Sequence, residues 1–279
     1  MSGRYLSNNH QHQQPPPSPS WHRSPPPPDG SGLLPAPATS KGCMSAATKR
    51  WKYLRRLLLF RQMDFEFAFW QMIYLFSAPR QVYRNFQYRK QTKLQFARDD
   101  PAFLVLLSGW LVVSSAGFAF VLNIGFWAFV RLLLYVIFVD CIGVGLLIAT
   151  ALWSLSNRYL LRPSARAESD VEWGFAFDVH LNAFFPLLVI LHFVQLFFYH
   201  LVINRDALLS TFVGNSLWLV ALGYYIYITF LGYSSLNILH KTKVFLYPMI
   251  PLGVFFLFSV AVNWNLSRSL MYFYRNRVL

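Results

Sequence analysis

Five long apolar runs limit what this chain can fold into more than any other feature of its sequence. They cover about residues 101–122, 127–153, 182–203, 212–233 and 244–262. Each approaches or exceeds the roughly 20 residues that a helix needs to cross the hydrocarbon core of a bilayer. A soluble fold of these runs would have no polar exterior, whereas a membrane helix satisfies its own backbone hydrogen bonds. The sequence therefore predicts an all-α fold, a polytopic membrane helix bundle with five transmembrane helices.

The overall composition agrees with a membrane protein. Hydrophobic residues make up 55% of the chain and charged residues only 13%, against a charged share of roughly 25% in soluble domains. Residues 1–40 contain no apolar core long enough for a signal peptide, so we expect the first span to direct the chain to the membrane. A disulfide between the two cysteines, Cys43 and Cys141, is implausible because they lie in such different segments.

The chain divides into three segments by composition. Residues 1–48 contain "QQPPPSPS" and "SPPPPDG", and such a stretch cannot bury enough apolar surface to offset the entropy lost on ordering. We expect a disordered Pro-rich N-terminal tail there. Residues 49–98 form a basic, aromatic segment that we expect to hold cytosolic or interfacial helices, and residues 99–279 form the five-span membrane domain.

The basic segment carries much of the formal net charge of +14. Thirteen of the 25 Lys and Arg residues lie between Lys41 and Arg98, where the only acidic residues are Asp64 and Glu66. Such a local excess indicates an anionic neighbour, and anionic lipid headgroups, an acidic protein and RNA are the candidates. The residues expected to bind a partner, lipid or RNA are Arg55, Arg56, Arg61, Arg80, Arg84, Arg89, Lys90 and Lys93.

One stretch of this segment, "RQMDFEFAFWQMIYL" at residues 61–75, resembles a membrane helix but is too short to be one. Pro79 ends it, which leaves about 16 residues or roughly 24 Å of helix. We interpret it as a helix that lies partly in the headgroup region and partly against the membrane domain, with Asp64 and Glu66 paired to arginines. A helix in the core of a soluble-side domain is the alternative.

The approach to the first span and the loops between spans predict the orientation. In "RDDP", Asp99 or Asp100 can cap the helix that Pro101 begins. Lys and Arg alternate between loops as expected for a cytosolic N-terminus, and five spans then place the C-terminus in the lumen. Three arginines after the last span argue against this orientation, but the N-terminal excess is larger. The lumenal sequon at Asn265 lies too close to the membrane for glycosylation.

Asp140 lies in the middle of the second predicted span. A central carboxylate costs about 2.5–3.5 kcal/mol on insertion scales, so we expect it to face the bundle and either find a partner or be protonated. Gly143 and Gly145 follow it and allow close helix packing. Both an ion or proton site and a buried hydrogen-bonding group are consistent with this pattern.

The third span begins with several polar residues in "DVEWGFAFDVHLNAFFPLLVILHFVQLFF". Asp178, Asn182 and His192 share one helix face, which suggests either a hydrated path or interhelical hydrogen bonds. No metal or cofactor is predicted, because His180 and His192 are more than three turns apart. Tyr224, Tyr225 and Tyr227 can bond to these groups, and Pro248 and Pro251 should kink the fifth span. The intramembrane polar candidates are Asp140, Asp178, His180, Asn182, His192 and Gln195.

Motifs for catalysis are missing from the sequence. It contains no Gly-rich phosphate loop, nucleophile elbow or zinc signature, so no catalytic residues are predicted and the protein is not expected to be an enzyme. The two halves of the chain do not repeat each other, and the inverted-repeat logic of transporters therefore finds no support.

Long blocks from residue 49 onward carry a family resemblance. They include "KRWKYLRRLLLFRQMDFEFAFWQMIYLF", "VYRNFQYRKQTKLQFARDDPAFLVLL", "DCIGVGLLIAT" and "VGNSLWLVALGYYIYITFLGY". The chain resembles the Unc-fifty (uncoordinated-fifty) homologue family of Golgi multi-pass membrane proteins over roughly residues 49–279. The resemblance implies five spans, a cytosolic N-terminus, and links to cell-surface expression of nicotinic acetylcholine receptors and to Arf guanine-nucleotide exchange factors. RNA binding and the inner nuclear membrane have also been ascribed to members.

Three functions are consistent with these features. The first is a non-enzymatic trafficking protein of the early secretory pathway, with anionic lipids, an Arf exchange factor and client receptor subunits as partners of the basic segment and membrane domain. The second is a transporter, channel or lipid-moving protein that uses Asp140 and the stripe from Asp178 to His192. The third is RNA binding by residues 49–98, since basic residues with interleaved aromatics suit phosphate contacts and base stacking.

Overall fold

The computed structural model describes residues 63–84, 100–163 and 170–278. Within these ranges, five helices are long and apolar enough to cross a membrane, which confirms the predicted fold class. The spans consist of α4 (Ala102–Leu122); α5 (Phe126–Tyr135), η3 (Val136–Gly143), α6 (Val144–Leu155) and η4 (Ser156–Leu160); α7 (Trp173–Leu188), η5 (Val189–Val194), α8 (Gln195–Phe198) and η6 (Tyr199–Ile203); α9 (Leu208–Ser234); and η7 (Thr242–Leu246) with α10 (Met249–Ala261).

The second and third spans are longer than the apolar runs predicted. The second is 35 residues long and the third is 31, and the third begins at Trp173 instead of residue 182. The η3, η4, η5 and η6 stretches are π-helical, a form that occurs mostly as single-turn bulges inside α-helices. The hydropathy pattern placed the start of the third span too late, because Asp178 and His180 are buried against neighbouring helices.

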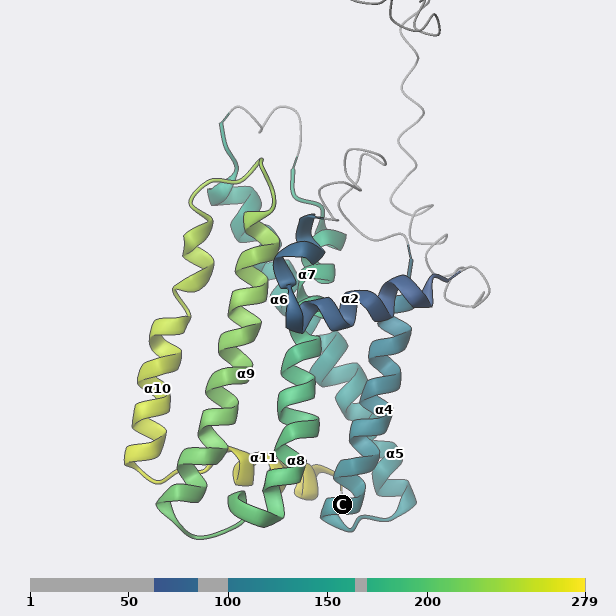
Figure 1. The fold of residues 1–279 in the computed structure, drawn as a ribbon, viewed down its shortest axis with the longest axis vertical. Helices are drawn as coiled ribbons and strands as arrows, with labels where there is room; N and C mark the ends of the chain where they lie inside the picture. Colours follow the sequence, from purple (N-terminus) through teal and green to yellow (C-terminus); the bar gives the residue numbers. More distant parts are fainter. Residues whose placement is uncertain (1–62, 85–99, 164–169, 279) are drawn as a thin grey trace, which may run out of the picture. The chain divides into compact units, whose positions relative to one another are not determined.

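Helix α7 lies at the centre of the bundle, between α6 and α9 (Figure 1). Twelve of its 16 side chains are buried, so its polar residues must find partners inside the protein. The neighbouring helices approach it closely at small residues. A Cβ at Gly145 of α6 would lie 2.5 Å from the His180 ring, and one at Gly232 of α9 would lie 2.8 Å from Val179. The expected packing role of Gly145 is therefore confirmed.

The fifth span lies at the edge of the bundle and packs mainly against α9. Its helix is interrupted between Leu246 and Met249, where Pro248 is the N-cap residue of α10. The predicted break therefore occurs at Pro248, whereas Pro251 lies in the first turn of α10 and the helix continues through it. Only 11% of the residues in the span's most apolar 18-residue stretch are buried. The remaining faces of α10 are therefore available to lipid, consistent with an apolar side chain on nearly every turn.

Two short helices lie across the ends of the bundle (Figure 1). Helix α2 (Phe65–Ser77) packs on α4 and α7 at the end where α4 begins, and α11 (Leu266–Val278) packs on α9 and α5 at the end where α10 finishes. Each has 13 residues, too few to cross a bilayer. Because five spans separate them, α2 and α11 lie at opposite faces of the membrane. Helix α11 was not expected from the sequence.

Candidate functional site: a membrane-surface platform

The start of α2 is fixed by two aspartates. The Asp64 carboxylate caps the helix by accepting a 2.9 Å hydrogen bond from the Phe67 amide. The Asp100 carboxylate accepts bonds from the amides of both Asp64 (2.8 Å) and Ala102 (3.0 Å). Asp100 therefore satisfies the first amide of α4, as expected of an aspartate in "RDDP", although the N-cap residue is Pro101 and the helix begins at Ala102. Asp100 also ties the beginning of α2 to the beginning of α4. The predicted pairing of Asp64 and Glu66 with neighbouring arginines such as Arg61 involves residues outside the described ranges.

The inner face of α2 is held on the bundle by hydrogen bonds as well as by apolar contacts. The Gln71 amide donates to the Asn182 side-chain oxygen of α7 at 2.9 Å in a buried setting. At the other end, the last carbonyls of a helix have no intrahelical partner. One of these carbonyls, that of Leu75, accepts a 2.7 Å hydrogen bond from the Tyr224 hydroxyl of α9. Helix α2 thus packs on the membrane spans and not on a separate soluble core.

The outer face of α2 is apolar and exposed. Phe69 and Ile73 are 53% and 50% exposed, and their spacing of four residues places them on one side of the helix. Phe76 is 43% exposed, but its ring contacts Phe185 of α7 and Tyr224 of α9. A helix with an apolar outer face that lies across the end of a membrane bundle fits the boundary between headgroups and acyl chains. The described geometry thus combines contact with the membrane domain and an apolar surface for lipid.

After Ala78 the chain resumes a helix over residues 79–84. Val82 and Tyr83 are buried, with the Tyr83 ring against Gly232 of α9, while Arg80 and Arg84 are exposed one turn apart. We call residues 64–84 the platform: two short helical pieces seated on the bundle, with two arginines directed outward. The other basic candidates lie outside the described residues: Arg55, Arg56, Arg61, Arg89, Lys90 and Lys93.

His180 joins three helices inside the bundle. Its Nδ1 lies 2.8 Å from the Tyr225 hydroxyl and its Nε2 lies 3.2 Å from the Cys141 carbonyl oxygen. A carbonyl can only accept, so Nε2 carries the proton and donates it, and in the neutral ring Nδ1 accepts from Tyr225. The expectation that a tyrosine of the fourth span bonds to a histidine is confirmed for this pair.

Asp140 finds its partner outside the five spans. The buried Tyr274 hydroxyl of α11 donates to the Asp140 carboxylate at 2.9 Å. Burial, followed by the nearby Asp140 charge, raises the pKa of Tyr274 well above its usual range, so the hydroxyl stays a donor. The sequence interpretation offered Tyr224, Tyr225 and Tyr227 as partners and missed Tyr274. The sequence signal that indicates this helix is the four-residue spacing of the apolar side chains of Leu266, Leu270 and Tyr274.

The remaining polar residues of the third span have separate surroundings. His192 contacts the rings of Phe118 of α4 and Tyr274 of α11, with centroids 4.9 Å and 6.3 Å away. Gln195 and Asp178 are buried, and within the described residues neither amide atom of Gln195 has a hydrogen-bond partner. The π-helical stretch from Val189 to Val194 changes the rotation per residue, so residues after it leave the face that regular spacing predicts.

A cation site does not emerge from these groups. Among residues 63–84, 100–163 and 170–278, no three His, Cys, Asp or Glu side chains are grouped so that they could hold a metal ion. What the structure does gather is a set of interhelical hydrogen bonds. Asn182 bonds to α2, His180 bonds to η3 and α9, and Asp140 bonds to α11.

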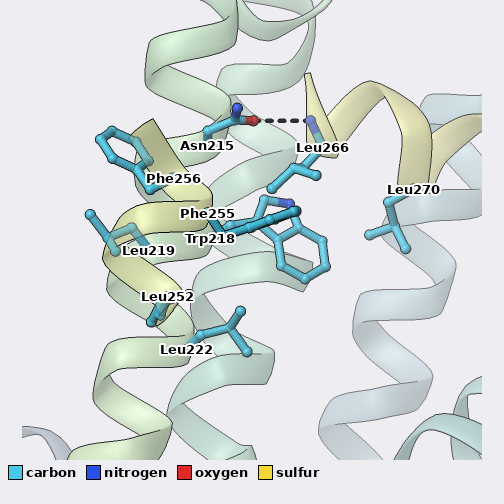
Figure 2. Close-up of a pocket in the computed structure, with 9 residues that line it drawn as sticks. All are labelled: Asn215, Trp218, Leu219, Leu222, Leu252, Phe255, Phe256, Leu266 and Leu270. Atoms are coloured by element: carbon cyan, nitrogen blue, oxygen red, sulfur yellow. Dashed lines mark hydrogen bonds between the residues drawn. The ribbon is translucent and has the colours of Figure 1, made fainter. Parts of the chain in front are cut away.

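An apolar pocket of about 280 Å³ lies between α9, α10 and α11 (Figure 2). Asn215 closes one end of it and connects the three helices. Its amide nitrogen donates to Ser259 Oγ and to the Trp264 carbonyl oxygen, each at 2.9 Å, and its oxygen accepts from the Leu266 amide at 2.9 Å. The other walls are apolar: Trp218, Leu219, Leu222, Leu252, Phe255, Phe256, Leu266 and Leu270.

Comparison with known families identifies the protein's relatives. The sequence model of the UNC-50 family matches residues 53–275. The chain belongs to the UNC-50 family. It is 62% identical to the protein unc-50 homolog of Rattus norvegicus over 234 residues, which is 84% of this chain and 90% of the relative. No solved structure matches the chain.

Other animals carry similar UNC-50 proteins. The human protein unc-50 homolog is 59% identical over 249 residues, covering 89% of this chain and 95% of the relative. The protein unc-50 homolog of Drosophila melanogaster is 56% identical over 246 residues, covering 88% and 89%. The UNC-50 match includes the platform, all five spans and most of α11, and this confirms the resemblance seen in the sequence.

Proposed function

We propose that this UNC-50 family member is a non-enzymatic Golgi membrane protein that supports vesicle trafficking and cell-surface expression of receptors of the nicotinic acetylcholine type. In this proposal the platform faces the cytosol and recruits an Arf guanine-nucleotide exchange factor. The observation that carries it is the seating of the platform. Buried contacts on α4, α7 and α9 hold Arg80 and Arg84 outward at the end of the bundle.

A fixed platform suits recruitment for a physical reason. Association is opposed by the entropy of ordering the groups that meet at the interface. A helix already held at both ends loses less of that entropy when a partner binds. Exposed arginines attract acidic surfaces and anionic headgroups, and this raises the rate of encounter. The lipid-facing side chains of α2 keep the same charges close to the membrane, where coat and exchange factors act.

The test is affinity purification of the full chain from cells in mild detergent. We expect the wild type to recover Arf exchange factors and the quadruple variant Arg80→Gln, Arg84→Gln, Arg89→Gln, Lys90→Gln to lose most of that recovery. Lys241→Gln with Lys243→Gln is the control for charge loss outside the platform, because both residues are exposed, Lys241 just before η7 and Lys243 at its start, on the platform side of the membrane. Equal recovery by all three forms would contradict the proposal.

RNA is a competing ligand for the same charges. Salt dependence does not separate RNA from anionic lipid, since both present phosphates. Treating the extract with nuclease before the purification addresses this. If the platform is a protein-binding surface, nuclease treatment leaves recovery of the exchange factor unchanged. Recovery that disappears with nuclease would instead make RNA the ligand of the platform.

A second candidate is transport of an ion or lipid through the bundle. It is favoured by Asp140 and by the buried, unpartnered amide of Gln195 within the described part of the chain. Purified protein in liposomes should then show flux or lipid movement that Asp140→Asn abolishes. If the protein recruits the exchange factor and the liposomes show no flux or lipid movement, trafficking is the one of these two functions that remains.

A further inference from the structure

The face of the protein opposite the platform carries a charge imbalance that trafficking by the platform does not explain. Residues 123–125, 204–207 and 262–278 form the loops and helix at that end, and they contain four arginines and a single acidic residue, Asp206. Asp206 forms an ion pair with Arg268. For a lumenal face this excess departs from the usual distribution of Lys and Arg around spans, so a local reason for it is needed.

Two of the arginines line one pocket. A cavity of about 520 Å³ lies between α11, the end of η6 and the end of α4. Arg268 and Arg275 both line it, and their spacing of seven residues places them on the same side of α11. Within the described residues Arg275 forms no ion pair, and the charge of Arg268 is shared with Asp206 alone. The pocket therefore has a net positive wall.

The pocket also offers neutral donors. Tyr199 lines it, and the Tyr199 hydroxyl interacts electrostatically with both Arg268 and Arg275; among the described residues it has no hydrogen-bond partner. The side chain of Asn204 is exposed beside it. Guanidinium, phenol and amide donors around one hollow are the groups that bind phosphate oxygens, and arginine binds them in bidentate geometry.

The position of the pocket suits a ligand at the membrane surface. Leu122 and Met271 supply apolar wall, and α11 lies across the end of the bundle where headgroups begin. Arginine side chains on an open surface would contact bulk headgroups without selecting one. A concave site between three elements is different, because it encloses the group that it binds.

We propose that this pocket binds a phosphate group, either the headgroup of a phospholipid in the leaflet at the α11 face or a soluble phosphate ester. The proposal does not depend on the platform or on exchange-factor recruitment. It assigns a second anion-binding surface to the opposite membrane face, with Arg275 and Arg268 as its charged ligands and Tyr199 as a neutral donor.

The experiment is isothermal titration of the purified full chain in non-ionic detergent with two probes, dihexanoyl phosphatidate and glycerol 3-phosphate. Saturable binding of phosphatidate alone identifies a lipid headgroup site, and equal affinity for glycerol 3-phosphate identifies a soluble phosphate ester. In either case Arg275→Gln should weaken binding roughly tenfold or more, since it removes a charge-assisted hydrogen bond. Absence of saturable binding by both probes overturns the proposal.

Matched variants separate binding from folding. Arg205→Gln removes a charge at the same face outside the pocket, and it should leave the affinity within roughly twofold of the wild type, because no contact to the ligand is lost. Tyr199→Phe keeps the charge and removes one donor, and it should weaken binding about threefold to tenfold. If Arg275→Gln and Tyr199→Phe both bind like Arg205→Gln, the pocket is not the site.

Discussion

The Tyr274 hydroxyl of α11 donates a 2.9 Å hydrogen bond to the carboxylate of Asp140, across 134 positions of sequence. The contact couples a short helix at the bundle end to the middle of the second span. It also answers the question that an intramembrane carboxylate raises, since a charged or polar group in that position needs a partner. Tyr274 is itself buried, with its ring against Phe118, His192 and Tyr135.

Tyr274→Phe should destabilise the protein by about 1–2 kcal/mol, because it leaves the Asp140 carboxylate without its donor while keeping the ring contacts. Thermal unfolding in detergent measures this. Tyr272→Phe is the control, since Tyr272 lies on the same helix and is 70% exposed. In a double-mutant cycle with Asp140→Asn the two losses should not add. Additive losses would show that the pair is not coupled.

Gln71→Leu should loosen the platform without unfolding the bundle. The change removes the buried bond to Asn182 and leaves a polar atom of α7 with one partner fewer, at a cost of about 0.5–2 kcal/mol. Hydrogen exchange is the suitable measurement, because it reports local opening. We expect faster exchange over residues 65–77 and unchanged exchange in α9. Glu66→Gln, on the exposed side of α2, should exchange like the wild type.

Gly145→Ala should be strongly destabilising. The new Cβ would meet the His180 ring at 2.5 Å, and that ring is held by bonds on both nitrogens, so it cannot move without breaking one. Overpacking of this kind costs about 1–3 kcal/mol. Gly109→Ala tests the same change in another span, where nothing lies within 4 Å of the added atom. A similar loss of stability in both variants would rule out the clash as the cause.

Asn215→Ala should detach α10 and α11 from α9. The side chain makes three hydrogen bonds to these elements, and α10 has few other buried contacts. Limited proteolysis between α10 and α11 should become several times faster, since local opening controls cleavage. Ser216→Ala removes only a bond to the Phe212 carbonyl within α9 and should leave the rate unchanged. Equal proteolysis of the two variants would count against Asn215 as the junction.

The features that the sequence determined by itself are those set by neighbouring residues. The number of spans follows from the number of apolar runs, the start of α4 follows from the acidic and proline residues of "RDDP", and the break before α10 follows from Pro248, because hydrophobic length, capping and proline geometry act within a few residues. The outward direction of Arg80 and Arg84 belongs partly to this class, since buried Val82 and Tyr83 alternate with them.

The tertiary structure decided which distant groups meet. Nothing in the sequence near Asp140 indicates Tyr274, because the pairing requires α11 to fold back across the bundle end. The stripe from Asp178 to His192 assumes regular helical spacing, and the π-helical stretch at residues 189–194 departs from that spacing at its His192 end. A sequence readily indicates that a polar residue in a membrane bundle has a hydrogen-bond partner. It does not identify that partner, because the partner depends on helix packing in three dimensions.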